Sequence, residues 1–293
     1  MITSVRIWAT NRPIAFVMIL LAIYFVVLSA PLVFSSGAFG GDESKSPNSI
    51  DLSHLPFELF LATSVVAVVS LVGWSKNARF ISAPDWSGIW APIILTLYIG
   101  SILTPGLMVA SGSGVDMGDV LASIPWGTFI LFMLLIGVFE EGLFRGVLLH
   151  GFEVRIGPVG ALLVSSVLFG SMHFVNWITG QTLGPTIDQV LHAGTLGFLF
   201  GAIALRMNSI WFGVATHALF DGVVDFNGQI LAAAAAIASA DPSVAETATT
   251  VVPSSNDISL SDSLLRVVLG HFELVFGSIV LWSWWRRRNR QQD

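Results

Sequence analysis

The chain has 293 residues, of which 54% are hydrophobic and only 11% are charged, and its mean hydropathy is +0.79. A soluble domain usually carries about 25% charged residues, so this composition excludes an ordinary soluble globular protein, a disordered chain and a collagen-like one. No cysteine is present, which excludes disulfides, thiolate metal ligands and a cysteine nucleophile. The net charge of −6, with a single basic cluster, gives no nucleic-acid footprint.

The apolar runs predict an all-α, polytopic membrane bundle of about eight transmembrane helices, because one span needs about 20 mostly apolar residues. The first run is longer than the apolar core of a signal peptide, which has about 7–15 residues, and we interpret it as a retained anchor. The seventh run is short and polar, and its inclusion depends on the loop charges. The predicted spans are Pro13–Phe34, Pro56–Trp74, Ile89–Val109, Trp126–Leu149, Pro158–Ile178, Ile187–Leu205, Ile210–Asp225 and Leu264–Trp285.

The charges between the spans predict the orientation, because Lys and Arg are enriched in cytoplasmic loops. With the N-terminus inside, the inner loops carry most of the basic residues and the outer loops most of the acidic ones; only Lys45 and Arg266 fall outside. Removing one span would reverse every later loop, so the alternation predicts an even number of crossings. We expect an integral protein of a prokaryotic plasma (inner) membrane with both termini cytoplasmic.

Two outer segments are predicted to be irregular because they are rich in small and polar residues, Ser35–His54 and Gly228–Ser263. The second begins with the alanine run Ala232–Ala236, which suits a short helix on the membrane surface. The chain therefore divides into three regions. These are N-terminal transmembrane helices and loops (1–125), a core that carries the polar motifs (126–225), and an outer loop with the last span and a basic tail (226–293).

Ionisable side chains gather in three of the eight spans, where each costs at least about 2.5–3.5 kcal/mol and so marks a functional site by default. In the fourth span, Glu140 and Glu141 are neighbours about 100° apart and cannot share one helical face. Glu141 and Arg145 are at i,i+4 and can form an ion pair, which leaves Glu140 without a partner on its own helix. An unpaired carboxylate in a dry site suits a general base or acid; alternatively, both glutamates belong to one ion network with Arg145.

The fifth and seventh spans each carry a histidine. Phe169 and His173 share a helical face in the fifth span, and His173 by itself suits a hydrogen-bonded core residue as readily as a catalyst. In the seventh span, His217, Asp221 and Asp225 form a polar stripe at i,i+4,i+8. By itself that stripe suits either a proton path or a seam of hydrogen bonds between helices.

The polar residues of the three spans are predicted to lie at a similar depth in the membrane. At about 1.5 Å per residue, Glu140, His173 and His217 all fall in the middle to inner part of a hydrocarbon core of about 30 Å. Three different helices can therefore bring one glutamate and two histidines together. The other histidines are expected to be structural, with His192 paired with Asp188 one turn earlier and His271 close to Glu273; they are His54, His150, His192 and His271.

Three common motifs are absent from the sequence: Gly-x-Ser-x-Gly, His-Glu-x-x-His and Walker A. Their absence disfavours an α/β-hydrolase, the usual zincin arrangement and a P-loop nucleotide site. What remains is a carboxylate with histidines, and two uses of this set stay open. In one, a Glu–His pair deprotonates a water for attack on an amide while a second histidine stabilises the oxyanion. In the other, Glu140, His173 and His217 hold a divalent metal such as zinc.

Three ordered motifs carry a resemblance to a known family: Glu140-Glu141-x-x-x-Arg145, then Phe169-x-x-x-His173, then His217-x-x-x-Asp221. In this order, in successive polar spans, they resemble the CPBP intramembrane proteases. This family includes the CAAX proteases and bacteriocin-processing proteins, and is also called ABI or type II CAAX prenyl endopeptidase. The resemblance covers about Trp126–Asp225, a third of the chain.

The resemblance implies an eight-helix endopeptidase that hydrolyses a peptide bond of a membrane-associated protein or peptide, lipidated or not. It implies either a glutamate-dependent mechanism without a cofactor or a divalent metal such as zinc. The roles that it implies are water activation by Glu140 and His173, oxyanion-side positions for His217 and Asp221, and support of the site by Glu141, Arg145 and Phe169.

The last motif departs from the pattern of the CAAX-processing members, which typically have asparagine where this chain has Asp221. An ionised aspartate would repel an oxyanion. Asp221 is therefore expected to be protonated, to orient His217 through a hydrogen bond, or to bind a metal.

The competing function is a non-catalytic membrane protein, such as an immunity or scaffold protein with a CPBP fold, because a fold does not fix a function. The presence of Glu140, His173 and His217 disfavours this alternative, since a scaffold has no need of costly intramembrane polar groups. A transporter is disfavoured further, because no internal repeat and no paired broken helices are visible.

Overall fold

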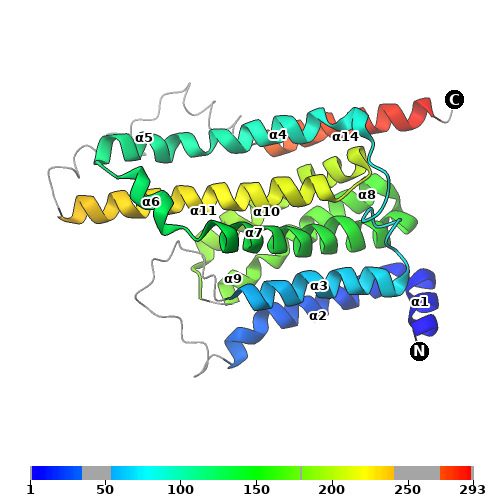
Figure 1. The fold of residues 1–293 in the computed structure, drawn as a ribbon. Helices are drawn as coiled ribbons and strands as arrows, with labels where there is room; N and C mark the ends of the chain where they lie inside the picture. The colour runs from blue at the N-terminus through cyan, green and yellow to red at the C-terminus, as the bar shows by residue number, and fades with distance from the viewer. Residues whose placement is uncertain (1, 35–53, 179, 241–270, 292–293) are drawn as a thin grey trace.

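The computed structural model describes residues 2–34, 54–178, 180–240 and 271–291. These residues form helices and no strand, which confirms the all-α prediction. The helices pack into one elongated bundle (Figure 1). They are α1 (Ile2–Asn11), α2 (Pro13–Phe34), α3 (Leu55–Val72), the 3-10 turn η2 (Trp86–Gly88), α4 (Trp90–Ser101), α5 (Leu103–Ser113), α6 (Met117–Ser123), α7 (Trp126–Glu141), the π-helix η3 (Gly142–Leu148), α8 (Leu149–Met172), α9 (Phe174–Ile178), α10 (Leu183–Met207), α11 (Trp211–Ala240) and α14 (Phe272–Arg290).

Four helical stretches of the described chain are long and apolar enough to cross a membrane, or five if the bent pair α1 and α2 counts as one span. The longest, Trp126–Ile178, has 53 residues, more than twice what one crossing needs. Gly157, with φ +74°, interrupts its helical backbone. The Ser165 hydroxyl donates a hydrogen bond of 2.8 Å to the Phe144 carbonyl, so the two halves lie side by side. This stretch thus contains the predicted fourth and fifth spans.

Helices α11 and α14 occupy the predicted seventh and eighth spans, but neither meets the apolarity test for a crossing helix. Their polar residues explain this, because α11 carries the His217 motif and α14 ends in the arginine cluster. The number eight therefore stays a prediction. Helix α1 and the C-terminal end of α14 lie at the same end of the bundle, as an even number of crossings requires (Figure 1).

The expectation for the alanine run was wrong. Ala232–Ala236 is not a separate surface helix but part of α11, which continues without interruption to Ala240. Alanine has the highest helix propensity of all residues, so the run prolongs the helix that precedes it. The rest of the predicted outer loop, 241–263, lies outside the described residues, as does 35–53 of the first irregular segment.

Close backbone contacts at glycines fix the helices that carry the polar motifs. A methyl group at Gly137 of α7 would lie 2.9 Å from the carbonyl oxygen of Val214 in α11. At Gly170 of α8, it would collide with the carbonyl oxygen of Val190 in α10. Small residues allow such close helix packing in membranes. Gly137 and Val214 each lie three residues before a predicted site residue, so this contact brings Glu140 and His217 to the same level.

The absence of native cysteine makes the topology directly testable. We expect Ser4→Cys and Gln291→Cys to react with a membrane-impermeant maleimide from one side of sealed spheroplasts, and Asp119→Cys of α6 from the other. Labelling only after permeabilisation identifies the inner side. Labelling of the two terminal positions from opposite sides would contradict an even number of crossings.

Candidate active site

The predicted ion pair between Glu141 and Arg145 is present and is buried. Nη1 of Arg145 lies 3.1 Å from Oε1 of Glu141, and their side chains are 1% and 0% exposed. The guanidinium carbon also lies 4.1 Å from the ring centre of Phe169 and 5.4 Å from that of Phe200. A guanidinium over an aromatic face is attracted by the ring quadrupole. Arg145 thus connects the end of α7 to α8 and α10.

The backbone around this pair is not an ordinary α-helix. Glu141 ends α7, and the π-helix η3 begins at Gly142 and contains Arg145. Such widened turns are rare and occur frequently at functional sites. The i,i+4 spacing of Glu141 and Arg145 does not distinguish a π-helix from an α-helix, so this change of helix type was not predicted.

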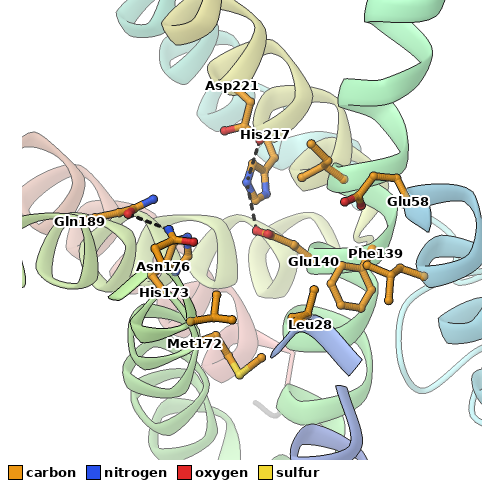
Figure 2. A pocket seen from close by; sticks show the side chains of 13 residues that line it. Leu28, Glu58, Phe139, Glu140, Met172, His173, Asn176, Gln189, His217 and Asp221 are labelled. Atoms are coloured by element: carbon orange, nitrogen blue, oxygen red, sulfur yellow. Dashed lines mark hydrogen bonds and ion pairs between the residues drawn. The ribbon is translucent and has the colours of Figure 1, made fainter. Parts of the chain in front are cut away.

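The imidazole of His217, on α11, lies among three carboxylates. Its Nδ1 lies 3.0 Å from Oε1 of Glu141. Its Nε2 lies 3.5 Å from both Oε2 of Glu140 and Oδ2 of Asp221 (Figure 2). The ring stacks on Phe200 with an interplanar angle of 19°. Glu140 has no partner on its own helix, as predicted, but it is not unpaired because α11 supplies one.

The distances around His217 suit a proton shared between its Nε2 and the two nearby carboxylates. The Nδ1–H donates to Glu141, because an ionised carboxylate only accepts hydrogen bonds. If Nε2 were bare and both Glu140 and Asp221 were ionised, their lone pairs would face one another. A proton on Nε2 or on one of the two carboxyl groups would place a donor between them. Two of the explanations for Asp221, a protonated side chain and a hydrogen bond that orients His217, fit this arrangement.

His173 directly follows α8 and faces the same region. Its Nδ1 lies 3.0 Å from the carbonyl oxygen of Phe169 and donates to it, since a carbonyl only accepts. The other ring nitrogen, Nε2, is then the one that can accept a proton. The Phe169 ring packs edge-on against both His173 and His217, at 5.2 and 6.0 Å between centres. Phe169 thus holds both imidazoles as well as Arg145.

A cavity of about 340 Å³ brings the predicted residues together (Figure 2). Glu140, His173, His217 and Asp221 all line it, whereas Glu141, Arg145 and Phe169 lie behind it. The side chains of Glu140 and Asp221 are 24% and 27% exposed, and both line the cavity. The remaining lining residues are Leu28, Glu58, Leu61, Ile136, Phe139, Met172, Val175, Asn176 and Gln189.

Three polar lining residues were missed by the sequence analysis: Glu58, Asn176 and Gln189. The amide of Asn176 donates a hydrogen bond of 2.9 Å to Oε1 of Gln189. Glu58 belongs to α3, in a span that the sequence marks as plainly apolar. Available signals were the carboxylate within an apolar run and the position of Asn176 three residues after His173.

The metal hypothesis is not favoured by the geometry. Among the residues that the structure describes, no group of three His, Asp or Glu side chains is arranged to hold a metal ion. Glu140, His173 and His217 share a cavity, but His217 directs its nitrogens to carboxylates at 3.0 and 3.5 Å.

The other histidines do not line the cavity, as expected for structural residues. One detail of that expectation was wrong, because His192 pairs with Glu273 of α14, at 3.5 Å, and not with Asp188. The Tyr98 hydroxyl donates a second hydrogen bond to the same carboxylate. His150 packs edge-on against Trp74, while His54 and His271 precede α3 and α14.

Residues 122–223 match the model of a protein family, described as type II CAAX prenyl endopeptidase Rce1-like. This segment is an Rce1-like domain. It contains all seven predicted site residues and agrees with the resemblance to the CPBP intramembrane proteases. No curated protein and no solved structure matches the chain. The Rce1-like domain spans about a third of the chain, and the three-region division stays a prediction.

The Rce1-like domain contains a sensitive contact between α7 and α11. A methyl group at Gly213 would lie 2.7 Å from Oε2 of Glu141, whereas at Gly222 of the same helix the nearest atom is 3.6 Å away. We expect Gly213→Ala to lower the free energy of unfolding by about 1–3 kcal/mol, because Glu141 must move away from His217.

The matched control is Gly222→Ala, which is expected to be neutral or to stabilise by up to about 1 kcal/mol, since alanine is the better helix former. Thermal unfolding of both variants in one detergent measures the difference. Equal stability of the two variants would show that Glu141 is not held tightly against α11.

Proposed function

We propose that the chain is an intramembrane endopeptidase in which Glu140 and His173 activate a water molecule. The observation that carries this proposal is the single cavity lined by Glu140 and by His173, with the His217 ring beside it. A cavity of about 340 Å³ has room for a water, which occupies about 30 Å³ in the liquid, together with part of a peptide. The Rce1-like domain supports membership of a membrane protease family.

In the proposed mechanism, the water oxygen attacks the carbonyl carbon of the scissile bond while Glu140 or Nε2 of His173 takes the proton. The same proton then passes to the amide nitrogen as the carbon–nitrogen bond breaks, which releases an amine and a carboxylic acid. Each group acts first as base and then as acid. Hydrolysis is complete without a covalent intermediate.

The oxyanion that forms needs a hydrogen-bond donor. His217 supplies it through Nε2–H, because Nδ1 is held by Glu141 at 3.0 Å. Asp221, 3.5 Å from Nε2, keeps the proton on that nitrogen or donates its own. This proposal gives an aspartate a role at the oxyanion side even though an ionised aspartate alone would repel the charge.

Glu141, Arg145 and Phe169 are proposed as positioning residues. Glu141 fixes the tautomer and direction of the His217 ring, Arg145 balances the charge of Glu141, and Phe169 separates the two imidazoles. None of the three lines the cavity, so they act through the residues that do.

The substrate is proposed to be a membrane-associated protein or peptide, lipidated or not. The cavity combines the polar groups with apolar walls from Leu28, Leu61 and Met172, which suits an extended peptide that enters from the membrane. We place the protein in a prokaryotic plasma membrane with both termini cytoplasmic, on the charge pattern of its loops. Nothing in the described residues favours a non-catalytic scaffold.

Substitution of the proposed base tests the function without knowledge of the substrate. We expect Glu140→Gln to reduce cleavage on the order of 100-fold or more, because an amide cannot take the proton from water. The measurement compares new peptide ends, by mass spectrometry, in membranes of cells that express the wild-type protein or the variant.

The matched control is Asp225→Asn, which removes a carboxylate one turn beyond Asp221 that does not line the cavity. It should leave the set of peptide ends unchanged. Wild-type peptide ends that persist with folded Glu140→Gln protein would refute the role of Glu140.

Metal removal separates the two chemistries that the residues allow. Because the described residues hold no arranged ligand set, we expect cleavage to persist after dialysis against EDTA and 1,10-phenanthroline. Loss of cleavage that is restored by added zinc, with metal bound in proportion to protein, would replace the glutamate mechanism with a metal-dependent one.

A further inference from the structure

A second cavity, of about 570 Å³, lies at the end of the bundle where both termini are found. Arginine dominates its lining, whereas the cavity of the candidate active site is lined by the carboxylates of Glu58, Glu140 and Asp221. These residues come from three elements: the 3-10 turn η2, the last turn of α10 and the C-terminal half of α14. The lining residues are Ser87, Arg206, Trp282, Ser283, Arg286, Arg287, Arg290 and Gln291.

Two of the arginines are held rigidly around one aspartate. Arg206, 5% exposed, lies 3.1 Å from Asp85, and Nε of Arg287 lies 2.6 Å from the same carboxylate. Both guanidinium groups also donate to the Ser87 hydroxyl, at 2.7 and 2.6 Å. Partial burial alone would raise the pKa of Asp85, but the Ser87 hydrogen bonds and the two arginines lower it. The aspartate stays ionised and fixes the wall of the cavity.

The other two arginines have no acidic partner among the described residues. Arg286 lies over the ring of Trp282, 4.5 Å from its centre, and Arg290 lines the cavity from the last turn of α14. Within the part of the chain that the structure describes, Asp85 alone offsets the four guanidinium groups, which leaves three of these positive charges without an acidic partner. Positive charges without acidic partners around a cavity favour the binding of an anion there.

The position along α14 identifies the kind of anion. Trp282 and Trp285 are 54% and 52% exposed and lie four residues and one residue before Arg286. Exposed tryptophan marks the level where the hydrocarbon meets the headgroups. The arginines that follow therefore lie at the depth of lipid phosphates, beside a cavity that is open to them.

We propose that this basic cavity is a binding site for the phosphate of an anionic lipid headgroup. Arg286 and Arg290 bind the phosphate, since a planar guanidinium matches phosphate oxygens in a bidentate way. Arg206 and Arg287, held by Asp85 and Ser87, form the charged floor. Basic pockets between membrane helices bind lipid headgroups in this way.

The experiment uses the full chain in a neutral detergent. Dioctanoyl phosphatidylglycerol is titrated, and bound lipid is measured by native mass spectrometry. We expect binding about tenfold or more tighter than that of dioctanoyl phosphatidylcholine, because the latter has no net charge. Inorganic phosphate at the same concentration is expected not to displace the lipid. Equal binding of the two lipids would refute the proposal, and displacement by phosphate would make the ligand a free anion.

Paired variants locate the binding on the protein. Arg286→Gln with Arg290→Gln should weaken phosphatidylglycerol binding by about tenfold or more. The control, Lys76→Gln with Arg288→Gln, removes the same charge from basic residues that do not line the cavity, and should bind the lipid as the wild type does. Equal losses in both pairs would mean that total charge, and not this cavity, attracts the lipid. The comparison of lipids on the wild-type chain needs no variant to fold.

Discussion

The buried ion pair of Glu141 and Arg145 is the interaction on which the site depends. Two charges without contact to water are tolerated only when each is compensated, and breaking such a pair costs about 3–5 kcal/mol. Here, Arg145 rests on the rings of Phe169 and Phe200 as well as beside Glu141. The pair thereby fixes α7, α8 and α10 relative to one another. Glu141 also accepts the hydrogen bond from His217 and so fixes α11.

A chain of contacts leads from this ion pair to the cavity. Glu141 holds Nδ1 of His217, which turns Nε2 toward Glu140 and Asp221. Phe169 spaces His217 from His173. The buried residues Glu141 and Arg145 therefore hold His217 in place, whereas Glu140 and His173 line the cavity. The two adjacent glutamates accordingly have different environments. Glu141 is 0% exposed and pairs with Arg145 and His217, whereas Glu140 is 24% exposed, contacts His217 and lines the cavity.

Much of the candidate site was predictable from the sequence, because the contacts within one helix follow from the spacing of its residues. Residues four apart share a helical face, which gave the Glu141–Arg145 pair. Depth along apolar runs placed Glu140, His173 and His217 at one level. Helix rotation and packing are not local, and for this reason Glu58 and the Asn176–Gln189 contact were missed. The partner of His192 was wrong for the same reason, since Glu273 approaches from α14 while Asp188 is nearer only in sequence. The alanine run was predicted as a separate helix, although its high helix propensity lets it continue α11 to Ala240.

The central claim, that water and not a side chain attacks the substrate, is tested most directly by a single turnover in oxygen-18 water with enzyme in excess over peptide. Mass spectrometry then follows the label. The account predicts one heavy oxygen in the new carboxyl end of the product and none in Glu140. An unlabelled product, with the label instead in the Glu140 carboxylate, would show that the glutamate attacks the peptide itself and would contradict the account.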